Sequence, residues 1–416
     1  MEGASSMAGG LRVDEARLAA TIEARADELA ALLRDLVRAP SVNPPGDTRA
    51  AAAVVTAWLA HQGLRAEVSG SAPERPSVVA RHTFGMARGA APTAGPRLLF
   101  LSHLDTVPLG DAAGWTVDPF GGEVRDGRLW GRGAADAKGS AAPMLLALSA
   151  LATTGAEGHG TLTVALVADE ETGGAGAQHL LAAGALAADA VVVGETTDNQ
   201  VAIAEKGVAW LRLSTRGRTA HASVPHAGAN AAAHLVRWLG RIERDVTTRL
   251  PERRHPLVTP PSLSVSALSS GVAPNVVPDY AEAVVDRRTL PGETLDSARA
   301  ELLAAAAALE ADDPAVRVAV DTLIWADPFE TPENAAVVQA ALAARRALGL
   351  TADAVGYQQA SDGRFFGARG VPTLVLGPGV PEGTHVPDES VPLAQVVEAA
   401  KLYALTACRY LRAPQA

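Results

Sequence analysis

Hydrophobic positions along the first two hundred residues follow two alternating periods, which predict alternating helices and strands. Apolar residues at helical spacing predict helices over residues 13–37, 48–63, 138–152 and near 175. The first helix should end at PSVNPPGD, because consecutive prolines cannot continue a helix. Short β-rich runs predict strands that begin at Ser77, Arg97, Thr161 and Ala190. This alternation is typical of an α/β domain around a mostly parallel central sheet.

The order of elements changes after residue 207. The pattern there predicts a strand from Val208, a helix over 230–245, two strands (SLSVSALSS and NVVPDYAEAVVDRR), a helix over 297–309 and a strand over 316–324. This βαββαβ order indicates a smaller α+β unit that suits a lid or dimerisation domain. Alternation then returns, with a helix over 335–348, a strand at Thr373 and a last helix. We therefore expect an α/β domain in two parts, 11–206 and 326–416, interrupted by a lid domain over 207–325.

Composition excludes several classes of partner. The 416 residues carry a net charge of −10 with no run of Lys or Arg, which disfavours nucleic acid. Apolar runs stop short of the roughly 20 residues that a membrane helix needs, and the start, MEGASSMAGGLRVDEARL, lacks a secretory-signal pattern. The single cysteine, Cys408, excludes an internal disulfide framework and a thiolate metal cluster. We expect a cytoplasmic protein that contacts no membrane.

A histidine and an aspartate follow the strand that begins at Arg97, in LLFLSHLDTVP. Residues two apart in an extended segment face the same side, so Asp105 can accept the second ring N–H of a metal-bound His103. Taken alone, a histidine at a strand end is more often a core or surface residue. The ligand hypothesis therefore depends on further clusters.

Three more clusters also follow predicted strands or lead into a helix. Asp136 lies in LWGRGAADAKGS, where a plain helix N-cap is the alternative role. Glu170 and Glu171 are adjacent in LVADEETGG, and they repel each other unless the loop is solvated or a cation lies nearby. Because neighbouring side chains diverge, one can bind a metal while the other acts as a base. Glu195 follows a strand in VVVGETTD, and His385 lies in the late loop GPGVPEGTHVPDES.

Together these clusters supply two histidines and three carboxylates as ligands, plus one free glutamate. Open α/β sheets bind their ligands beyond the carboxyl ends of the strands, so we expect these side chains to converge. Nitrogen and oxygen ligands without thiolate suit zinc. One carboxylate shared between two ions would give a pair about 3.5 to 4 Å apart.

The motifs, in their order along roughly residues 32–411, resemble the di-zinc amidohydrolases and exopeptidases. This family includes acetylornithine deacetylase, succinyl-diaminopimelate desuccinylase, aminoacylase and glutamate carboxypeptidase. The resemblance implies a zinc-exopeptidase-like catalytic domain with two Zn²⁺ (or Co²⁺ or Mn²⁺) per subunit. In the implied site, one ion is held by His103 and Glu195, the other by Glu171 and His385, Asp136 bridges the two, Asp105 supports His103, and Glu170 is the general base. It also implies a cis peptide bond after Asp136.

The resemblance also assigns roles in the lid and around the substrate. His221 in RGRTAHASVPHAGANA resembles a lid histidine that reaches the active site of a partner subunit, which implies a homodimer through the lid. Asn275 in GVAPNVVPD, Arg287 in VVDRR and Arg364 in ASDGRFF resemble positions that bind substrate. A guanidinium at position 364 suits a substrate carboxylate. For all four, an ordinary surface, turn or strand-edge role stays open.

The expected activity is hydrolysis of the N-acyl amide bond of an N-acyl-amino acid, whose free carboxylate Arg287 or Arg364 would bind. A metal pair lowers the pKa of water towards about 7, and Glu170 takes the proton of that water and delivers it to the leaving amine. A zinc carboxypeptidase or dipeptidase uses the same groups and stays an alternative, as does a mononuclear site. A catalytically silent binding protein of the same fold would be expected to lack a ligand or the base, and this chain has them all.

Two segments depart from the family pattern. Thr196 follows Glu195 where relatives often carry proline, a change that need not affect metal binding. Gln358, Gln359 and Ala360 precede SDGRFF where the desuccinylase branch has a smaller, glycine-rich turn. The second departure disfavours a succinyl-specific pocket.

Overall fold

The computed structural model describes residues 13–84, 95–156, 158–312 and 317–412. The chain divides into two compact units. The first comprises Met1–Ile203, Thr331–Val355 and Ser361–Ala416, and the second comprises Ala204–Glu330 and Gly356–Ala360. The last of these segments lies in the part of the sequence that we had assigned to the α/β domain. Residues 11, 12, 85–94, 157, 313–316 and 413–416 of the predicted segments lie outside the described residues.

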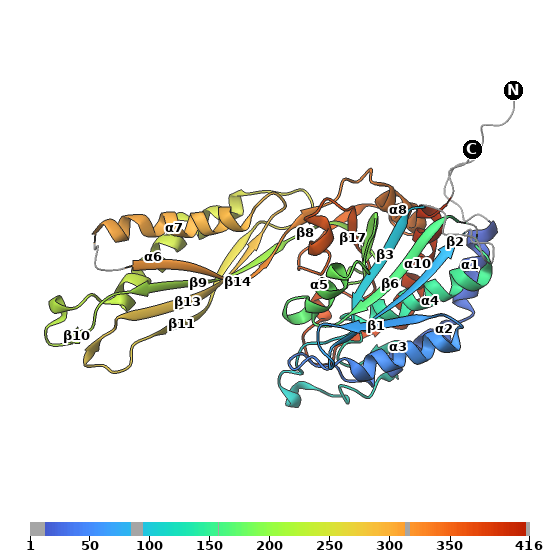
Figure 1. Cartoon of the computed structure of the whole chain (residues 1–416), viewed down its shortest axis with the longest axis horizontal. Helices are drawn as coiled ribbons and strands as arrows, with labels where there is room; N and C mark the ends of the chain where they lie inside the picture. Colours follow the sequence, from blue (N-terminus) through green and yellow to red (C-terminus); the bar gives the residue numbers. More distant parts are fainter. Residues whose placement is uncertain (1–12, 85–94, 157, 313–316, 413–416) are drawn as a thin grey trace, which may run out of the picture. The chain divides into compact units, whose positions relative to one another are not determined.

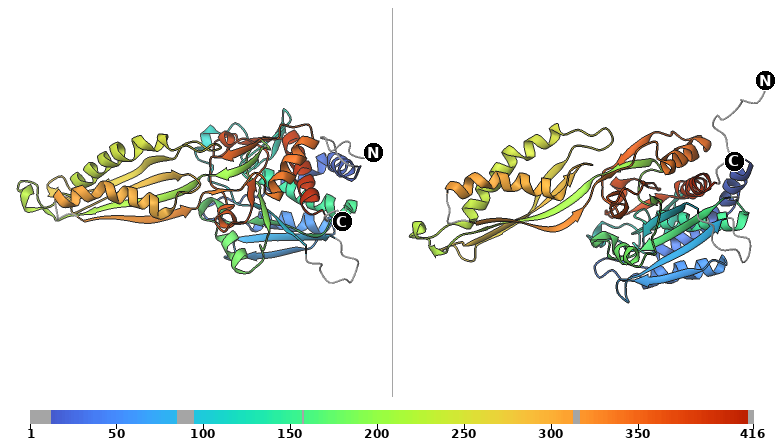
Figure 2. Two further views of the ribbon diagram at one scale, coloured as in Figure 1. Left: turned by 90° about the horizontal axis from the view of Figure 1, so that it is seen from above. Right: turned by 45° about the horizontal axis from the view of Figure 1, so that its top comes forward.

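The first unit is built on a mixed sheet with a parallel centre (Figures 1 and 2). The strands follow the spatial order β1 (Ala66–Gly70), β2 (Pro76–Phe84), β6 (Gly160–Val167), β3 (Arg97–His103), β7 (Ala190–Val193), β17 (Thr373–Val375) and β8 (Val201–Glu205). The central strands β6, β3, β7 and β17 run parallel, whereas β1, β2 and β8 pair antiparallel with their neighbours. The predicted α/β fold is confirmed.

Helices cover this sheet. They are α1 (Val13–Glu23), α2 (Ala26–Val37), α3 (Arg49–His61), α4 (Lys138–Thr154), α5 (Ala175–Ala182), α8 (Ala336–Ala347), α9 (Arg364–Gly367) and α10 (Leu393–Tyr410). The helix α4 packs on β3 and β6, and α10 packs on α4 and α8. Because α4 lies between the sheet and α10, every residue from Lys138 to Leu151 is buried. A small antiparallel sheet of β4 (Glu123–Arg125), β5 (Arg128–Trp130) and β18 (Ser390–Pro392) completes the unit.

The prediction of one helix over residues 13–37 is wrong, because the chain turns between α1 and α2 at Arg25. The Arg25 guanidinium donates to Glu28 on α2 and to two more distant residues, Ser149 on α4 and Gln62 after α3. These contacts join segments far apart in the sequence, so the local apolar pattern could not predict the turn.

The second unit is an antiparallel sheet with two helices on one face. Its sheet has the order β11 (Ser262–Ser270), β13 (Tyr280–Thr289), β9 (Gly207–Arg216) and β14 (Arg317–Ala326), and its helices are α6 (Ala231–Asp245) and α7 (Leu295–Asp312). Alternate residues of β13 are buried, and three of them, Ala281, Ala283 and Val285, form a core with Trp238 of α6 and Leu302 of α7. The observed order is the predicted βαββαβ order, with β10 (Ala220–His221) and β12 (Val276–Val277) forming an added two-stranded pair. Two further short strands, β15 (Phe329–Glu330) and β16 (Ala354–Tyr357), pair with β8.

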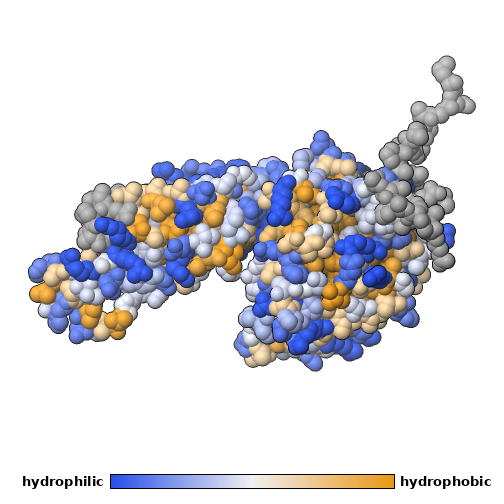
Figure 3. Space-filling model, in the orientation of Figure 1, coloured by the Kyte–Doolittle hydropathy of each residue, from blue (hydrophilic) through white to orange (hydrophobic). Residues whose placement is uncertain are grey.

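Two features of the structure concern membrane contact: the length and composition of its helices, and the hydropathy of its surface. Within the described residues, no helix combines the length and apolar composition that crossing a bilayer requires. On the face of the molecule in Figure 3, hydrophilic and hydrophobic residues are interspersed over both units. Cys408 is buried in α10, as expected for a small apolar side chain.

Candidate metal centre

The predicted ligands gather at one edge of the first unit's sheet. His103 is the last residue of β3, Glu195 follows β7, and Glu171 follows β6. These strands are parallel neighbours, so their carboxyl ends meet at the same edge. Asp136 comes from the loop between β5 and α4, and His385 from the loop after β17. The strands of the sheet and the loops beside them thus bring five side chains from distant parts of the sequence together.

These five side chains form two groups that share Asp136. The Nε2 atom of His103 lies 3.1 Å from Oδ1 of Asp136 and 3.5 Å from Oε1 of Glu195. The Nε2 atom of His385 lies 3.2 Å from Oδ2 of Asp136 and 3.3 Å from Oε2 of Glu171. Within each group, the possible ligand atoms lie within 4.8 Å of one another. Each oxygen of Asp136 therefore faces a different imidazole.

Asp136 does not cap the following helix. The N-cap of α4 is Ala137, which makes no side-chain capping bond, and the carboxylate of Asp136 faces the two imidazoles instead. The peptide bond between Asp136 and Ala137 is cis, as the resemblance implied. The alternative role of Asp136 as a plain N-cap is wrong.

The predicted hydrogen bond between the side chains of His103 and Asp105 is absent from the structure. Nδ1 of His103 lies 2.9 Å from the backbone oxygen of Asp105 and 3.7 Å from its nearest carboxylate oxygen. The ring therefore donates to the carbonyl, which leaves Nε2 free to bind a metal. A main-chain carbonyl, rather than the predicted carboxylate, therefore orients the His103 ring.

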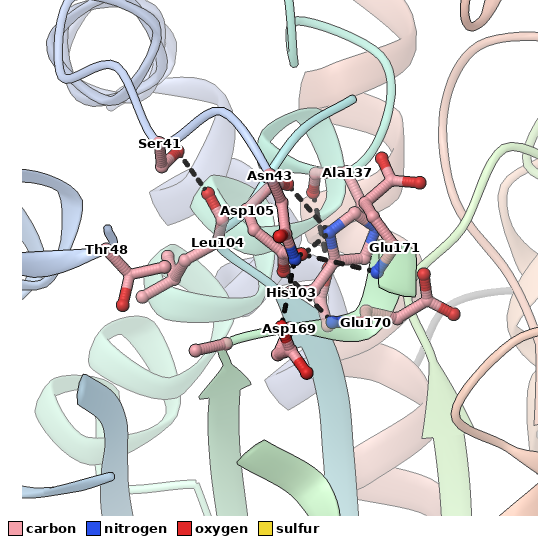
Figure 4. A network of polar contacts seen from close by, with 12 residues as sticks. Ser41, Asn43, Thr48, His103, Leu104, Asp105, Ala137, Asp169, Glu170 and Glu171 are labelled. Carbon is pink, nitrogen blue, oxygen red and sulfur yellow. Dashed lines mark hydrogen bonds and ion pairs between the residues drawn. The ribbon is translucent and has the colours of Figure 1, made fainter. Parts of the chain in front are cut away.

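The Asp105 carboxylate instead holds the turn that carries the two glutamates. Its two oxygens accept hydrogen bonds from the backbone N–H groups of Glu170 (3.1 Å) and Glu171 (3.2 Å). This turn is a short 3₁₀ helix, Glu170–Thr172, rather than extended chain. Figure 4 shows a further residue in this network, Asn43, whose place in the helix-ending motif PSVNPPGD gave no sign of this role.

A second missed group supports Asp136. Glu389 is fully buried, and its Oε1 accepts hydrogen bonds from the backbone N–H groups of Ala135 (2.9 Å) and Asp136 (3.1 Å). Its Oε2 lies 2.6 Å from the buried Arg132 guanidinium. Both residues lie inside the motifs that we singled out, yet their pairing across more than 250 residues gives no local signal.

The electrostatics of the centre fit a pair of cations. Burial, followed by the charge of Asp136, raises the pKa of Glu195 well above its usual range. Hydrogen bonds to Asp136 and Glu171 raise the pKa of His385 to about 10, so an imidazolium balances the carboxylates in the absence of metal. The Oε1 atom of Glu171 is buried and has no hydrogen-bond partner. A buried carboxylate cluster with an unsatisfied oxygen is a donor set that divalent metals complete.

Glu170 belongs to neither ligand group and lies next to another buried carboxylate. Burial, followed by the charge of Asp362, raises the pKa of Glu170 well above its usual range. Asp362 is 2% exposed, neither of its oxygens makes a hydrogen bond, and Oδ1 lies 3.2 Å from Arg364. The guanidinium of Arg364 also lies over the Phe365 ring, 4.7 Å from its centroid. The motif ASDGRFF pointed to Arg364, whereas Asp362, two residues before it, carries no signal in the sequence.

The remaining predicted residues lie in the second unit. Arg287 is 1% exposed and pairs with Glu293 at 3.0 Å, so its guanidinium stabilises the inside of this unit. A substrate-binding role for Arg287 stays a prediction, and it would need this buried pair to open. His221 is exposed, with Nδ1 2.7 Å from Oγ of Ser223, and the exposed Asn275 accepts a backbone hydrogen bond from Ala222.

The fold and the site together define a metal-dependent hydrolase of peptide or amide bonds. Residues 99–409 match the model of peptidase family M20/M25/M40, so the chain belongs to that family.

Solved structures share this fold over nearly the whole chain. The aminopeptidase PepT from Bacillus cereus matches with a TM-score of 0.73 and 19% identity, covering 92% of this chain and 98% of that chain. Human carnosine dipeptidase 1 matches with a TM-score of 0.72 and 18% identity, covering 96% and 99%. The Bacillus subtilis YXEP protein, described as a dinuclear metal-binding peptidase, matches with a TM-score of 0.71 and 17% identity, covering 94% and 99%.

Proposed function

We propose that this protein hydrolyses the N-acyl amide bond of an N-acyl-amino acid. The proposal rests on the pair of ligand groups that share Asp136. Glu170 belongs to neither group and lies on the same turn as Glu171. A shared carboxylate, one imidazole and one further carboxylate per ion are the donor set of a two-metal hydrolase. This arrangement favours hydrolysis over a silent binding role, because no ligand and no base is missing.

The proposed cofactor is two divalent cations per chain, Zn²⁺ or alternatively Co²⁺ or Mn²⁺. His103 and Glu195 would hold one ion, Glu171 and His385 the other, and Asp136 would hold both. Such ions lower the pKa of water and polarise a carbonyl oxygen. The hydrogen bond from Nδ1 of His103 to the carbonyl of Asp105 would keep Nε2 unprotonated and aimed at its ion.

Glu170 would move the proton. Its raised pKa makes the carboxylate a stronger base than an exposed glutamate, so it can accept a proton from the attacking water. The same group then donates that proton to the departing nitrogen, which could not leave as an anion. The hydrogen bond from the backbone N–H of Glu170 to Asp105 would fix the position of the base.

Substrate recognition would use Arg364 for the free carboxylate, with Asn275 and His221 as contacts from the second unit and His221 polarising the scissile carbonyl. We infer that His221 comes from a partner subunit in a homodimer. The edge strand β11 supports this, because it exposes Val265 (46%) and Leu268 (58%). Light scattering that finds an active monomer would remove the dimer from the proposal. We also propose that the enzyme is cytoplasmic, because a single, buried cysteine suits a reducing compartment.

A dipeptidase or carboxypeptidase is the second candidate. The match to a peptidase family favours it, and the same ligands, base and carboxylate-binding Arg364 would serve a dipeptide. The two candidates differ in the group on the far side of the scissile bond, an acyl chain or an amino-acid residue.

The test is a paired substrate screen of the metal-loaded protein. Acetyl-, formyl- and succinyl-amino acids are compared with dipeptides, and Glu170→Gln serves as the blank. The proposal expects the highest kcat/KM on an acyl-amino acid and a loss of at least about 100-fold in kcat for Glu170→Gln. Faster turnover of dipeptides would establish the second candidate, and full turnover by Glu170→Gln would refute the role of the base.

A further inference from the structure

We propose that Asn43 is a positioning residue for the turn that carries Glu170 and Glu171, and that it couples this turn to the end of β3. The inference rests on the proposed function of Glu170 as base and Glu171 as metal ligand. It assigns a role to the PSVNPPGD segment, which the sequence analysis used only as a helix terminator. Asn43 is 3% exposed and lies at the centre of the network in Figure 4.

The Asn43 amide bridges two carboxylates. Its Nδ2 lies 2.9 Å from Oδ2 of Asp105, 3.0 Å from Oδ1 of Asp169 and 3.0 Å from Oγ1 of Thr172. The Thr172 hydroxyl donates to Asp169 at 2.8 Å and accepts from the amide, so the two amide hydrogens of Asn43 serve three acceptors, two of which are carboxylates. The reversed amide would place its oxygen against both carboxylates, which fixes the orientation.

The two carboxylates hold the turn from both sides. Asp105 accepts the backbone N–H groups of Glu170 and Glu171, and Asp169 immediately precedes Glu170. Asp169 has a left-handed backbone (φ 70°), and its Oδ1 also accepts from Arg75 at 3.0 Å. If Asn43 shifted, two residues would lose its hydrogen bond. They are Asp169, which precedes Glu170, and Asp105, which accepts the backbone N–H of Glu170.

The backbone of Asn43 is itself fixed to the strand end that carries His103. Its N–H donates to the carbonyl of Thr106 at 2.7 Å, and the N–H of Thr106 donates to Ser41 at 3.0 Å. A Cβ atom on Gly46 (φ 81°) would lie 3.0 Å from Oδ1 of Asn43, so the following turn closes tightly around the amide. The amide thus has little room to move.

An amide suits this position better than other side chains. A carboxylate at position 43 would bring a third negative charge against Asp105 and Asp169, and the two like charges would repel it. A serine hydroxyl is too short to reach both acceptors and carries one hydrogen instead of two. The requirement for two donors between two carboxylates therefore selects Asn at this position.

The metal ligands on the two sides of the site should respond differently to the loss of Asn43. The turn carries Glu171, which belongs to the group with His385, and it carries no ligand of the group with His103 and Glu195. A merely structural role would weaken both groups alike. If Asn43 positions the turn, its loss should weaken metal binding at the group with Glu171 and His385 and leave binding at the group with His103 and Glu195 unchanged.

The experiment compares Asn43→Ser with Ser41→Ala in the full-length protein. Ser41 is a matched control, because it is buried two residues away and its hydroxyl donates to the carbonyl of Leu104 at 2.6 Å, with no contact to the turn. Zn²⁺ binding is measured by calorimetry, and kcat and KM are measured at saturating Zn²⁺ on the best acyl-amino acid or dipeptide. If Asn43→Ser does not fold, Thr172→Ala cuts the same network at its exposed end.

For Asn43→Ser we expect kcat to fall by about 10- to 100-fold, KM to change by less than about threefold, and one Zn²⁺ step to weaken by about tenfold. Thr172→Ala should change kcat in the same direction by about threefold, and Ser41→Ala should leave kcat and both Zn²⁺ steps unchanged. A kcat for Asn43→Ser equal to that of wild type, or equal weakening of both steps, would overturn the proposal. Wild-type protein that binds two ions but hydrolyses neither substrate class refutes the proposed function alone, and the calorimetric comparison still decides the role of Asn43.

Discussion

The buried ion pair of Arg132 and Glu389 shows how single residues secure the metal centre. Glu389 accepts hydrogen bonds from the backbone N–H groups of Ala135 and Asp136, and the Arg132 guanidinium at 2.6 Å balances its charge. The guanidinium also lies over the Trp115 ring, 5.2 Å from its centroid. Burial still raises the pKa of Glu389 to about 7, so the carboxylate depends on its cation.

Replacing Arg132 should therefore cost far more than replacing an exposed arginine. Arg132→Ala leaves Glu389 buried without a counter-charge, and we expect unfolding to become easier by about 3 to 5 kcal/mol. Chemical denaturation of the metal-free protein measures this loss. Arg97→Ala, which breaks the exposed pair with Asp189, is the control and should move the midpoint much less. Equal effects would contradict the supporting role of Arg132.

Asp362 predicts a pH dependence of stability. Burial raises its pKa from 3.8 to about 6, so between these values the folded state binds more protons than the unfolded state. Stability from this group is thus fully present below pH 3.8 and is lost as pH rises through about 6, by up to about 3 kcal/mol. Asp362→Asn cannot titrate, so its stability relative to wild type should grow between pH 4 and 6 in metal-free protein. A constant difference would show that Asp362 does not titrate in this range.

At the scale of elements, close packing joins the strand ends to α4. A Cβ atom on Gly377, which follows β17, would lie 2.2 Å from Oγ of Ser140 on α4 and 2.4 Å from the carbonyl oxygen of Glu195. The loop that carries Glu195 is therefore seated directly against the loop after β17. A side chain at position 377 must push these elements apart.

Gly377→Ala should destabilise the protein by about 1 to 3 kcal/mol through overpacking, and it should weaken Zn²⁺ binding by moving Glu195. Denaturation and calorimetry measure the two effects. Gly240 on α6 is the control, because a Cβ atom there meets nothing within 4 Å and alanine favours a helix. An unchanged Zn²⁺ affinity in Gly377→Ala would contradict the prediction that packing at this position controls the placement of Glu195.

Strands followed by acidic or histidine residues were predictable because their signal is local. The runs ending at His103, before Glu170 and before Glu195 are buried and apolar, and a polar residue marks the point where each strand ends. Other elements carry a weaker signal. The edge strand β1 is largely exposed, with no buried residue, so it lacks the buried apolar run that marks the central strands.

Residues that act through tertiary contacts were not predictable. Asn43 reads as a turn residue beside prolines, and its partners Asp105 and Asp169 are 62 and 126 positions away. The position of Asp105 was predicted, but its acceptor role shifted to the backbone N–H groups of the glutamate turn. The carboxylate and the backbone carbonyl of Asp105 both lie near the His103 imidazole, and the sequence spacing does not show which of the two accepts its hydrogen bond.

At the scale of the molecule, the two units have separate cores. We therefore expect Zn²⁺ to change the stability of one unit and a core mutation in the other unit to change the stability of that unit. All five proposed ligands lie in the first unit, and Trp238 lies in the core of the second, where its Nε1 donates to Leu302 at 2.8 Å. Zn²⁺ at 100 times its dissociation constant should stabilise the first unit by about 2.7 kcal/mol. Trp238→Ala should destabilise the second by about 3 to 5 kcal/mol.

Calorimetric unfolding with and without a chelator tests this division. We expect the chelator to lower the melting temperature of one transition and Trp238→Ala to lower that of the other. Leu239→Ala, at a half-buried neighbour of Trp238, is a milder control in the same helix. A single transition that responds equally to both changes would mean that the two units unfold as one.

The central claim is that five side chains hold two cations that share Asp136. Anomalous diffraction at the zinc edge from crystals grown with Zn²⁺ tests it most directly. The account predicts two peaks, one between His103 and Glu195 and one between Glu171 and His385, with an oxygen of Asp136 bound to each. A single peak that Asp136 does not contact, or zinc bound away from these side chains, would contradict it.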